Sequence, residues 1–423
     1  MTGETLPSWA PRQAAVILAM LEATEQGVRQ GQPADRVLTK LMGGSKKYGS
    51  RDRRLIRDAV FSWFRWHGAV GSLPLAQGLC AAWSLESREW PPALQEMLRE
   101  LGSPLPESND PARSLEQRKA DTESVLNCEL APVSEWLPSW WKEQTEHLGP
   151  YADRLAEHFE RPPTWLRVDA EARPQLHEAL LSDGAEWSGE TSPCSYAFAD
   201  AGKVSRWLQA HAEQLEVQDL SSQQVVRICN PSPGEKWWDA CCGNGGKSLQ
   251  LLDHAGRNLD LTCTDRREEV LSELTRRGRR HGLAKVRRYA LDLLQKDLQL
   301  PRIAFDGILL DAPCTGTGTW SRNPDAPWRT EASDIQQAKR RQLKMLDAVA
   351  PALPSGGQLI YAVCSLCRSE TLEVVTEFLA AHPEFSLSAF PHPLREVSTD
   401  GTLSLLPGET RADGMFVARF LRN

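Results

Sequence analysis

The carboxyl-terminal half of the chain alternates short apolar runs with segments of helical periodicity, and this alternation sets the fold class. Strand-like runs lie at Lys236–Ala240, Leu259–Thr264, Val286–Ala290, Phe305–Leu310 and Gln358–Val363. Helical patterns lie at Lys247–His254, Glu268–His281, Ser333–Ala350 and Ser369–Ala381. Strands that alternate with helices form βαβ units, whose crossover helices cover both faces of a mostly parallel sheet. We therefore predict an α/β fold from Pro231 onward, ending in a hairpin of 402–406 and 415–421.

Two tetrapeptides place a cysteine directly after a strand-like run. They are Asp311-Ala312-Pro313-Cys314 and Val363-Cys364-Ser365-Leu366. Open α/β sheets bind ligands outside the carboxyl ends of their strands, so a thiol there would face a substrate and could act as a nucleophile. A single free cysteine is more often a small buried apolar residue. Two cysteines in equivalent positions favour a functional site.

A glycine-rich turn follows the first predicted strand. It consists of Cys241, Cys242, Gly243, Asn244, Gly245, Gly246 and Lys247. Such a turn lets a ligand approach the backbone and directs free amide groups of the next helix toward it. Dinucleotides, nucleoside triphosphates and S-adenosylmethionine are the competing ligand classes. The spacing fails the dinucleotide fingerprint, and Gly246-Lys247-Ser248 matches only the end of a P-loop, which stays open as a less favoured alternative.

Acidic residues follow the next three strands. Asp265 follows the second strand, where a carboxylate can accept both hydroxyl groups of a ribose, and Asp292 follows the third, where it can accept an adenine amino group. Asp311 ends the fourth strand. Each acid could instead cap a helix or form a turn. Together with the glycine turn, they favour an adenosine-containing ligand without a polyphosphate.

The first half of the chain has a different pattern. Apolar residues recur at helical spacing over about 11–90 and again over 136–159, where Pro162-Pro163 ends the helical pattern. The polar stretch 102–121 predicts a loop or linker, and 164–168 predicts a strand. We predict a helical domain over 1–145, a small α/β adaptor over 146–230 and a third domain over 231–423.

Composition limits the partners. The net charge is −7 and the isoelectric point is near 5.8, which argues against nucleic-acid binding over the whole surface. Basic clusters at 46–54, 276–288 and 339–341 fit either local phosphate contacts or solvated helix faces. No run has the length and apolarity of a signal peptide or a membrane span, so a cytoplasmic protein with reduced thiols, no membrane partner and no metal is expected.

Further segments carry a family resemblance. They are Phe305–Gly318, Asn323-Pro324-Asp325, Trp328, Ile360–Ser365, Leu406-Pro407-Gly408 and Asp413–Phe416, with Arg161–Val168 and Val217–Gln223 upstream and, more loosely, Ser50–Arg54. These resemble the RsmB/Fmu family of RNA cytosine-5 methyltransferases. The resemblance implies a Rossmann-like S-adenosylmethionine-dependent methyltransferase domain over 231–423 and a helical, NusB-like RNA-binding domain before it. It implies an RNA substrate, with 16S rRNA expected and tRNA as the alternative, and we expect a monomer.

The resemblance also implies roles for individual residues. Cys241 to Lys247 would hold the methionine part of S-adenosylmethionine, Asp265 its ribose and Asp292 its adenine, with Asp311 between cofactor and base. Carbon 5 of cytosine is too poor a nucleophile to take a methyl group until a nucleophile adds to carbon 6. Cys364 would make this attack, and Cys314 would assist proton removal or release. Asp311 could contact ring nitrogen 3.

The chain departs from the family pattern in the glycine turn, after Cys364 and before Asn323, where two usual basic residues are reduced to Arg322. Asn244 stands where the family usually has proline, and Arg368-Ser369-Glu370-Thr371 stands where a Glu-Glu-Asn element is usual. Two rival interpretations follow from the sequence. Cys364-Ser365-Leu366-Cys367 has the spacing of a thioredoxin-like redox site. The altered glycine turn would also suit a non-catalytic RNA-binding or ribosome-assembly factor with the same fold.

Overall fold

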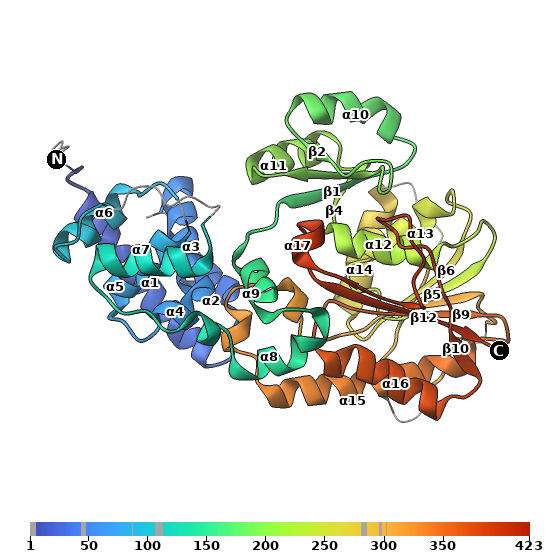
Figure 1. The fold of residues 1–423 in the computed structure, drawn as a ribbon. Helices are drawn as coiled ribbons and strands as arrows, with labels where there is room; N and C mark the ends of the chain where they lie inside the picture. Colours follow the sequence, from blue (N-terminus) through green and yellow to red (C-terminus); the bar gives the residue numbers. More distant parts are fainter. Residues whose placement is uncertain are drawn as a thin grey trace. The chain divides into compact units, whose positions relative to one another are not determined.

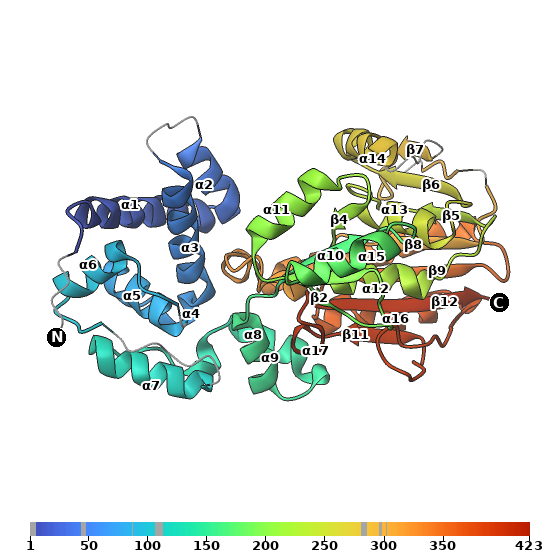
Figure 2. The ribbon, with the colours of Figure 1, turned by 90° about the horizontal axis from the view of Figure 1, so that it is seen from above.

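The chain forms two compact units. The computed structural model describes residues 6–43, 48–86, 88–105, 113–280, 286–295, 298–301 and 303–423. The first unit is Met1–Glu160 with Trp320–Glu331, and the second is Arg161–Thr319 with Ala332–Asn423. Figures 1 and 2 show the elements of each. The three-part division at 145 and 230 stays a prediction. Residues 146–160 of the predicted adaptor lie in the first unit, and residues 161–230 share the second unit with the carboxyl-terminal domain.

The first unit is helical, as predicted. Its helices are α1 (Ala10–Arg29), α2 (Ala34–Met42), α3 (Ser50–Arg65), α4 (His67–Val70), α5 (Leu75–Leu85), α6 (Pro92–Glu100), α7 (Leu115–Leu126), α8 (Ser139–Thr145) and α9 (Tyr151–Phe159). Large aromatic side chains form much of its core, and Trp66 stacks on Phe159 with ring centroids 4.3 Å apart. Trp63, Trp66, Trp136 and Trp141 therefore serve packing, whereas Trp9 is half exposed. The likeness to NusB stays a prediction.

The predicted loop over 102–121 is wrong in part, because α7 begins at Leu115. Ser114 forms a capping box with Gln117. The Ser114 Oγ accepts a hydrogen bond from the Gln117 N–H at 3.3 Å, and the Gln117 Oε1 accepts one from the Ser114 N–H at 3.0 Å. These bonds satisfy amide groups that a helix start leaves free. Residues 106–112 of the stretch lie outside the described residues.

The segment Trp320–Glu331 belongs to the first unit, although it follows the Cys314 region in the sequence. The Asp325 Oδ2 accepts a hydrogen bond from the N–H of Ala34, the first residue of α2, at 3.0 Å. The Trp328 Nε1 donates to the Phe64 carbonyl at 2.7 Å. Trp320 is buried among aromatic rings that include Trp141. Asp325 and Trp328 therefore have structural partners inside the helical unit.

The second unit begins with a small antiparallel sheet. Its strands are β1 (Thr164–Val168), β2 (Glu186–Trp187), β3 (Ser195–Phe198) and β4 (Leu215–Val217), in the order β2-β3-β1-β4, with helices α10 (Arg173–Ser182) and α11 (Ala201–Ala210). Leu166, Val168 and Tyr196 are fully buried in its core. The predicted strand over 164–168 and the mixed α/β character of this segment are confirmed.

A larger, mostly parallel sheet follows, as predicted. Its strands are β5 (Lys236–Asp239), β6 (Asp260–Asp265), β7 (Arg287–Ala290), β8 (Gly307–Asp311), β9 (Gln358–Val363), β10 (Phe385–Leu387), β11 (Thr402–Leu405) and β12 (Met415–Arg422). The order is β10-β12-β9-β8-β5-β6-β7, and β11 pairs with β12. Strands β5 to β9 pair in parallel, whereas β12 is antiparallel to its neighbours. The predicted strands and the closing hairpin are confirmed with small differences at their ends.

Helices cover both faces of this sheet (Figure 1). They are α12 (Leu220–Cys229), α13 (Gly246–His254) and α14 (Glu268–Arg280) on one face, and α15 (Ala332–Val349) and α16 (Leu372–Ala381) on the other; the short α17 (Pro407–Thr410) precedes β12. Successive strand side chains point to opposite faces. Trp237 therefore packs in the core on the α13 side, and Trp238 in the core on the α15 side. Residue 281, included in the predicted helix, lies outside the described residues.

Asp239 ends β5 and carries a buried carboxyl group. It is 1% exposed, and its Oδ2 accepts a hydrogen bond from the Ser248 Oγ at 2.6 Å. Its Oδ1 has no hydrogen-bond partner among the residues that the structure describes. Burial raises the pKa of Asp239 to about 7, although the hydrogen bond from Ser248 acts in the opposite direction.

We predict that Asp239 makes the fold less stable as the pH rises. The folded protein binds this proton more tightly than the unfolded chain, so stability falls between the ordinary pKa of 3.8 and about 7. The free energy of unfolding should fall by on the order of 3 kcal/mol between pH 5 and pH 8 from this group. Asp239→Asn should remove that fall in urea titrations. The control is Asp306→Asn, which changes an exposed carboxylate that accepts a hydrogen bond from the Lys236 N–H. This variant should keep the fall in stability between pH 5 and pH 8. Equal slopes for both variants would contradict the prediction.

Candidate active site

The carboxyl ends of three neighbouring parallel strands lie side by side at one edge of the larger sheet. In the register, Asp239 of β5 is opposite Leu309 of β8, and Asp311 of β8 is opposite Ala362 of β9. The glycine turn leaves β5 at this edge, the Cys314 segment leaves β8, and Cys364 directly follows β9. Parallel pairing therefore brings together segments that are far apart in the sequence.

The two cysteines singled out from the sequence are in contact. The Cys314 Sγ and the Cys364 Sγ are 3.4 Å apart, and both residues are partly exposed. The hydrogen bond to Cys364, burial and the nearby charge of Glu370 together raise the pKa of Cys314 well above its ordinary value. Cys314 is therefore held as a neutral thiol that can donate a hydrogen bond to the sulfur of Cys364.

Lys247 and Asp311 form an ion pair beside the thiols. Lys247 lies in the first turn of α13, and its Nζ is 2.7 Å from the Asp311 Oδ2. Burial alone would lower the pKa of Lys247, but the Asp311 carboxylate outweighs this effect and the pKa lies above its ordinary value. A negative charge on Cys364 would act in the same direction. Lys247 is thus a positive charge close enough to interact with Cys364.

Glu370 joins the two cysteine segments, a role that the sequence did not reveal. It is fully buried and lies in the short turn Arg368–Glu370. Its Oε1 accepts hydrogen bonds from the Thr315 N–H at 3.0 Å and from the Gln342 Nε2 at 2.9 Å. Its Oε2 accepts from the Ser365 Oγ at 2.7 Å and from the Thr315 hydroxyl. One carboxylate therefore holds the residue after Cys314 and the residue after Cys364.

Close backbone packing fixes the Cys314 segment further. The Gly318 N–H donates to the Cys364 carbonyl at 3.0 Å, and the Gly414 N–H donates to the Gly318 carbonyl at 2.7 Å. A Cβ atom on Gly318 would lie 2.2 Å from the Gly414 oxygen, so only glycine fits there. Gly414 immediately precedes β12, and the end of the closing hairpin therefore braces this segment.

Cys367 has a different environment from Cys364. It is fully buried, and its Sγ contacts the Thr317 Oγ1 at 3.6 Å. Burial raises the pKa of Cys367 above its ordinary value. Cys364 instead contacts Cys314. The geometry therefore does not favour a redox pair of Cys364 and Cys367.

The glycine turn has room for a ligand next to its backbone. Gly243 and Gly245 have φ angles of 50° and 82°, a conformation that favours glycine. A Cβ atom on Gly243 or Gly246 would meet nothing within 4 Å. Burial raises the pKa of Cys241, and for Cys242 a hydrogen bond with Cys263 is the main cause of a raised pKa. Both thiols of the turn are therefore poor nucleophiles.

The two remaining acids differ in their contacts. The Asp265 Oδ2 accepts a hydrogen bond from the Gly243 N–H at 3.1 Å, and the half-exposed Arg267 side chain pairs with both carboxylate oxygens. Burial opposes these bonds, but they prevail and the pKa of Asp265 lies below its ordinary value. Asp292 accepts from the Leu294 N–H at 3.0 Å and so caps its own turn. The structure thus ties Asp265, but not Asp292, to the glycine turn.

Several basic residues of the predicted patches form ion pairs with acidic side chains. Lys339 pairs with Glu373 and Glu377 at 2.6 Å each, and Arg276 pairs with Glu273. Residues 46, 47, 281 and 285 of these patches lie outside the described residues. Within the described ranges, no cluster of three His, Cys, Asp or Glu side chains could hold a metal ion, and no helix has the length and apolarity to cross a membrane.

Comparison with known proteins is consistent with this geometry. Residues 226–421 match the family described as 16S rRNA methyltransferase RsmB/F. Ribosomal RNA small subunit methyltransferase B of Pectobacterium atrosepticum is 31% identical over 329 residues, which cover 73% of this chain and 72% of the relative. The probable ribosomal RNA small subunit methyltransferase B of Synechocystis is 34% identical over 331 residues, which cover 72% and 71%.

A solved structure shows the same fold. The methyltransferase homolog protein from Pyrococcus horikoshii superposes with a TM-score of 0.54 at 21% identity, covering 68% of this chain and all of that one. The predicted Rossmann-like fold is therefore confirmed. From its sequence relatives, the chain belongs to the RsmB/F family of methyltransferases.

Proposed function

We propose that this protein methylates carbon 5 of a cytosine in 16S rRNA, with S-adenosylmethionine as methyl donor and a covalent bond between Cys364 and the base. The observation that carries the proposal is the 3.4 Å contact between the Cys314 and Cys364 sulfurs beside the Lys247–Asp311 ion pair. The proposed reaction needs a nucleophile first and a proton acceptor later. Two adjacent thiols, one of which is held neutral in the resting protein, suit these two roles. The names of the relatives support small-subunit rRNA as the substrate.

The residues of the glycine turn fit S-adenosylmethionine. The open space at Gly243 and Gly246 lets a ligand approach the backbone, and Asp265 is fixed against the turn by the Gly243 N–H. Asp265 would accept the ribose hydroxyl groups in place of the exposed Arg267 guanidinium, and Asp292 would accept the adenine amino group. When bound, the cofactor supplies a methyl group on a positively charged sulfur. Asp311 would lie between it and the base.

Cys364 would begin the reaction by adding to carbon 6 of the cytosine. A carbon–sulfur bond forms, the ring double bond between carbons 5 and 6 opens, and its electron pair moves through the ring. A proton from water would add to ring nitrogen 3, and the Asp311 carboxylate would accept a hydrogen bond from it. The positive charge of Lys247 would attract the negative charge of the attacking Cys364 sulfur. Carbon 5 thereby becomes electron-rich, which is the property that lets it accept a methyl group.

Cys314 would act after methylation. Once Cys364 is bonded to carbon 6, it can no longer accept a hydrogen bond as a thiolate, and the largest cause of the raised pKa of Cys314 is removed. The pKa of Cys314 would then fall, and its thiol proton would pass to water before the proton on carbon 5 must leave. As a thiolate, Cys314 would take that proton, and the electron pair of the carbon–hydrogen bond would re-form the double bond between carbons 5 and 6. The carbon–sulfur bond would break, Cys364 would leave as a thiolate, and ring nitrogen 3 would return its proton to water.

The first prediction tests the activity itself. Purified protein incubated with labelled S-adenosylmethionine should form 5-methylcytosine in 16S rRNA transcripts, read by nucleoside mass spectrometry, and Cys364→Ala should form none. Product only in a tRNA pool would make tRNA the substrate. Product in neither RNA would favour a non-catalytic RNA-binding factor and would reject the proposal.

The second prediction separates the two cysteines. Cys314→Ala should stop the reaction before release and accumulate an RNA–protein adduct that survives a denaturing gel, because no base removes the carbon 5 proton. Cys364→Ala should give neither adduct nor product. Cys194→Ala, a partly exposed cysteine of the small sheet region, is the control and should behave as the wild type. An adduct with Cys364→Ala but not with Cys314→Ala would exchange the two roles.

The third prediction concerns Glu370 as a positioning residue. Glu370→Gln replaces two accepting oxygens with one oxygen and an amide that cannot accept from Thr315 or Ser365, so the two cysteine segments should shift. Because small misplacements cost about a hundredfold in rate, we expect kcat to fall by about that factor. Binding of S-adenosylmethionine should not change. Loss of the carboxylate charge should also lower the pKa of Cys314 in a thiol titration.

The control for this variant is Glu373→Gln. Glu373 lies three residues further along and pairs with Lys339 near the surface. This variant should keep the wild-type kcat and the wild-type thiol titration. Equal losses of rate in both variants, or an unchanged Cys314 titration in Glu370→Gln, would show that Glu370 acts only through general stability.

A further inference from the structure

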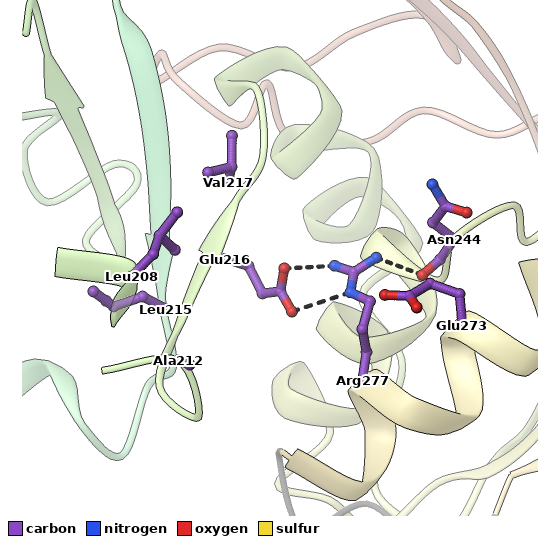
Figure 3. Close-up of a pocket in the computed structure, with 8 residues that line it drawn as sticks. All are labelled: Leu208, Ala212, Leu215, Glu216, Val217, Asn244, Glu273 and Arg277. Atoms are coloured by element: carbon purple, nitrogen blue, oxygen red, sulfur yellow. Dashed lines mark hydrogen bonds and ion pairs between the residues drawn. The ribbon is translucent and has the colours of Figure 1, made fainter. Parts of the chain in front are cut away.

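An ion pair ties the glycine turn to the small sheet (Figure 3). Arg277 of α14 donates a hydrogen bond from its Nη1 to the backbone carbonyl of Asn244. Its Nη2 and Nε contact the two carboxylate oxygens of Glu216, on β4, at 2.5 Å and 3.3 Å. Both side chains are 14% exposed. The guanidinium therefore joins three elements: β4, α14 and the turn after β5.

The geometry gives this contact more weight than an ordinary surface pair. Fork-to-fork pairing of arginine with a carboxylate fixes direction as well as distance. Glu216 is itself held in the sheet, where it is opposite Arg167 of β1. Arg277 thus has a rigid support on one side and the turn on the other.

The residues on either side of Asn244 have restraints of their own, including a hydrogen bond from the Gly245 N–H to the Cys242 carbonyl at 2.9 Å. The Cys242 N–H donates to the Thr264 carbonyl at 2.9 Å, and the Gly243 N–H donates to Asp265, so the first part is held by β6. Asn244 lies between two glycines with positive φ, where the backbone has the most freedom. In the described part of the chain, its N–H has no hydrogen-bond partner, and its carbonyl is held by Arg277.

A cavity lies next to this contact. Its volume is about 340 Å³, and its lining includes Leu208, Leu215 and Val217 besides Glu216, Asn244 and Arg277. Figure 3 shows the Arg277 guanidinium between the Glu216 carboxylate and the Asn244 carbonyl. If Arg277 were removed, water in the cavity would replace it at the carbonyl, because no neighbouring lining side chain is a cation.

We propose that Arg277, oriented by Glu216, is a positioning residue that holds the glycine turn in the shape that binds S-adenosylmethionine. The inference rests on the proposed function of that turn. Proline, which the family resemblance would place at 244, restricts the backbone covalently. In this chain a hydrogen bond to the Asn244 carbonyl supplies the restraint, and the small sheet is thereby part of the cofactor site.

The test compares Arg277→Ala, Arg277→Lys and Glu216→Gln with Arg276→Ala. Arg276 is the neighbouring arginine on α14 and pairs with Glu273, so its loss changes the charge equally but leaves the turn intact. By calorimetry, Arg277→Ala should bind S-adenosylmethionine about tenfold more weakly than the wild type, as expected for the loss of a hydrogen bond to a charged donor. The KM for this cofactor should rise equally while kcat changes little. Lysine should restore part of the affinity, and Glu216→Gln should show an intermediate loss.

Two further measurements isolate the turn. Without any cofactor, Arg277→Ala should speed hydrogen exchange at the Gly243 and Gly245 amides, and Arg276→Ala should not. Adding Asn244→Pro to Arg277→Ala should restore affinity, because proline removes no hydrogen bond of the Asn244 N–H and restricts the turn directly. Thermal unfolding of each variant controls for loss of the fold, and Glu216→Gln keeps the test open if Arg277→Ala does not fold.

The outcomes separate the two proposals. Wild-type protein that binds no S-adenosylmethionine would reject the proposed function and this inference with it. Wild-type protein that binds, with Arg277→Ala and Glu216→Gln binding equally well, would overturn the inference alone. The same holds if Arg276→Ala loses as much affinity, or if hydrogen exchange in the turn does not respond to Arg277.

Discussion

Parallel pairing of β5, β8 and β9 is the constraint on which the site depends. In parallel strands the carboxyl ends lie at the same edge, so whatever follows each strand meets at one place. Here these are a glycine turn with Lys247, a segment with Cys314, and Cys364. The alternate packing of Trp237 and Trp238 into opposite cores fixes how the strand β5 faces its helices, because a slip of one residue would exchange the two faces.

Three carboxylates in and near this site have different roles. Glu370 has four hydrogen-bond donors around its two oxygens, which satisfy this buried carboxylate, and its charge raises the pKa of Cys314. Asp239 accepts a hydrogen bond from the Ser248 hydroxyl at one of its oxygens, and burial shifts it toward the neutral form. Asp311 instead pairs with Lys247. Glu370 and Asp239 are equally buried and differ in their hydrogen-bond donors, whereas the Asp311 side chain is 30% exposed and pairs with a cation.

The sequence was most informative where a short local pattern determines structure. Apolar runs predicted the parallel strands, and the residues after them predicted which side chains lie at the sheet edge. The role of Glu370 was not predicted, because it comes from contacts with Thr315 and Gln342, which are distant in sequence. The role of Arg277 was not predicted for the same reason. In the sequence it is one arginine of a basic run, and only the fold places Glu216 beside it. The start of α7 was not predicted, because its polar residues also suit a linker. Ser114 and Gln117 nevertheless have the spacing of a capping box.

The path of the chain makes the two units inseparable by a single cut. The segment Trp320–Glu331 leaves the α/β unit after Thr319, joins the helical unit and returns at Ala332. A protein shortened to begin at Arg161 would expose the indole of Trp320 to water and leave Asp325 without Ala34. A helical fragment that ends at Glu160 would likewise lose the part of its interior that Trp320–Glu331 supplies. Replacement of the helical unit by another module would thus require two simultaneous changes, one in the amino-terminal helices and one in the loop after Cys314.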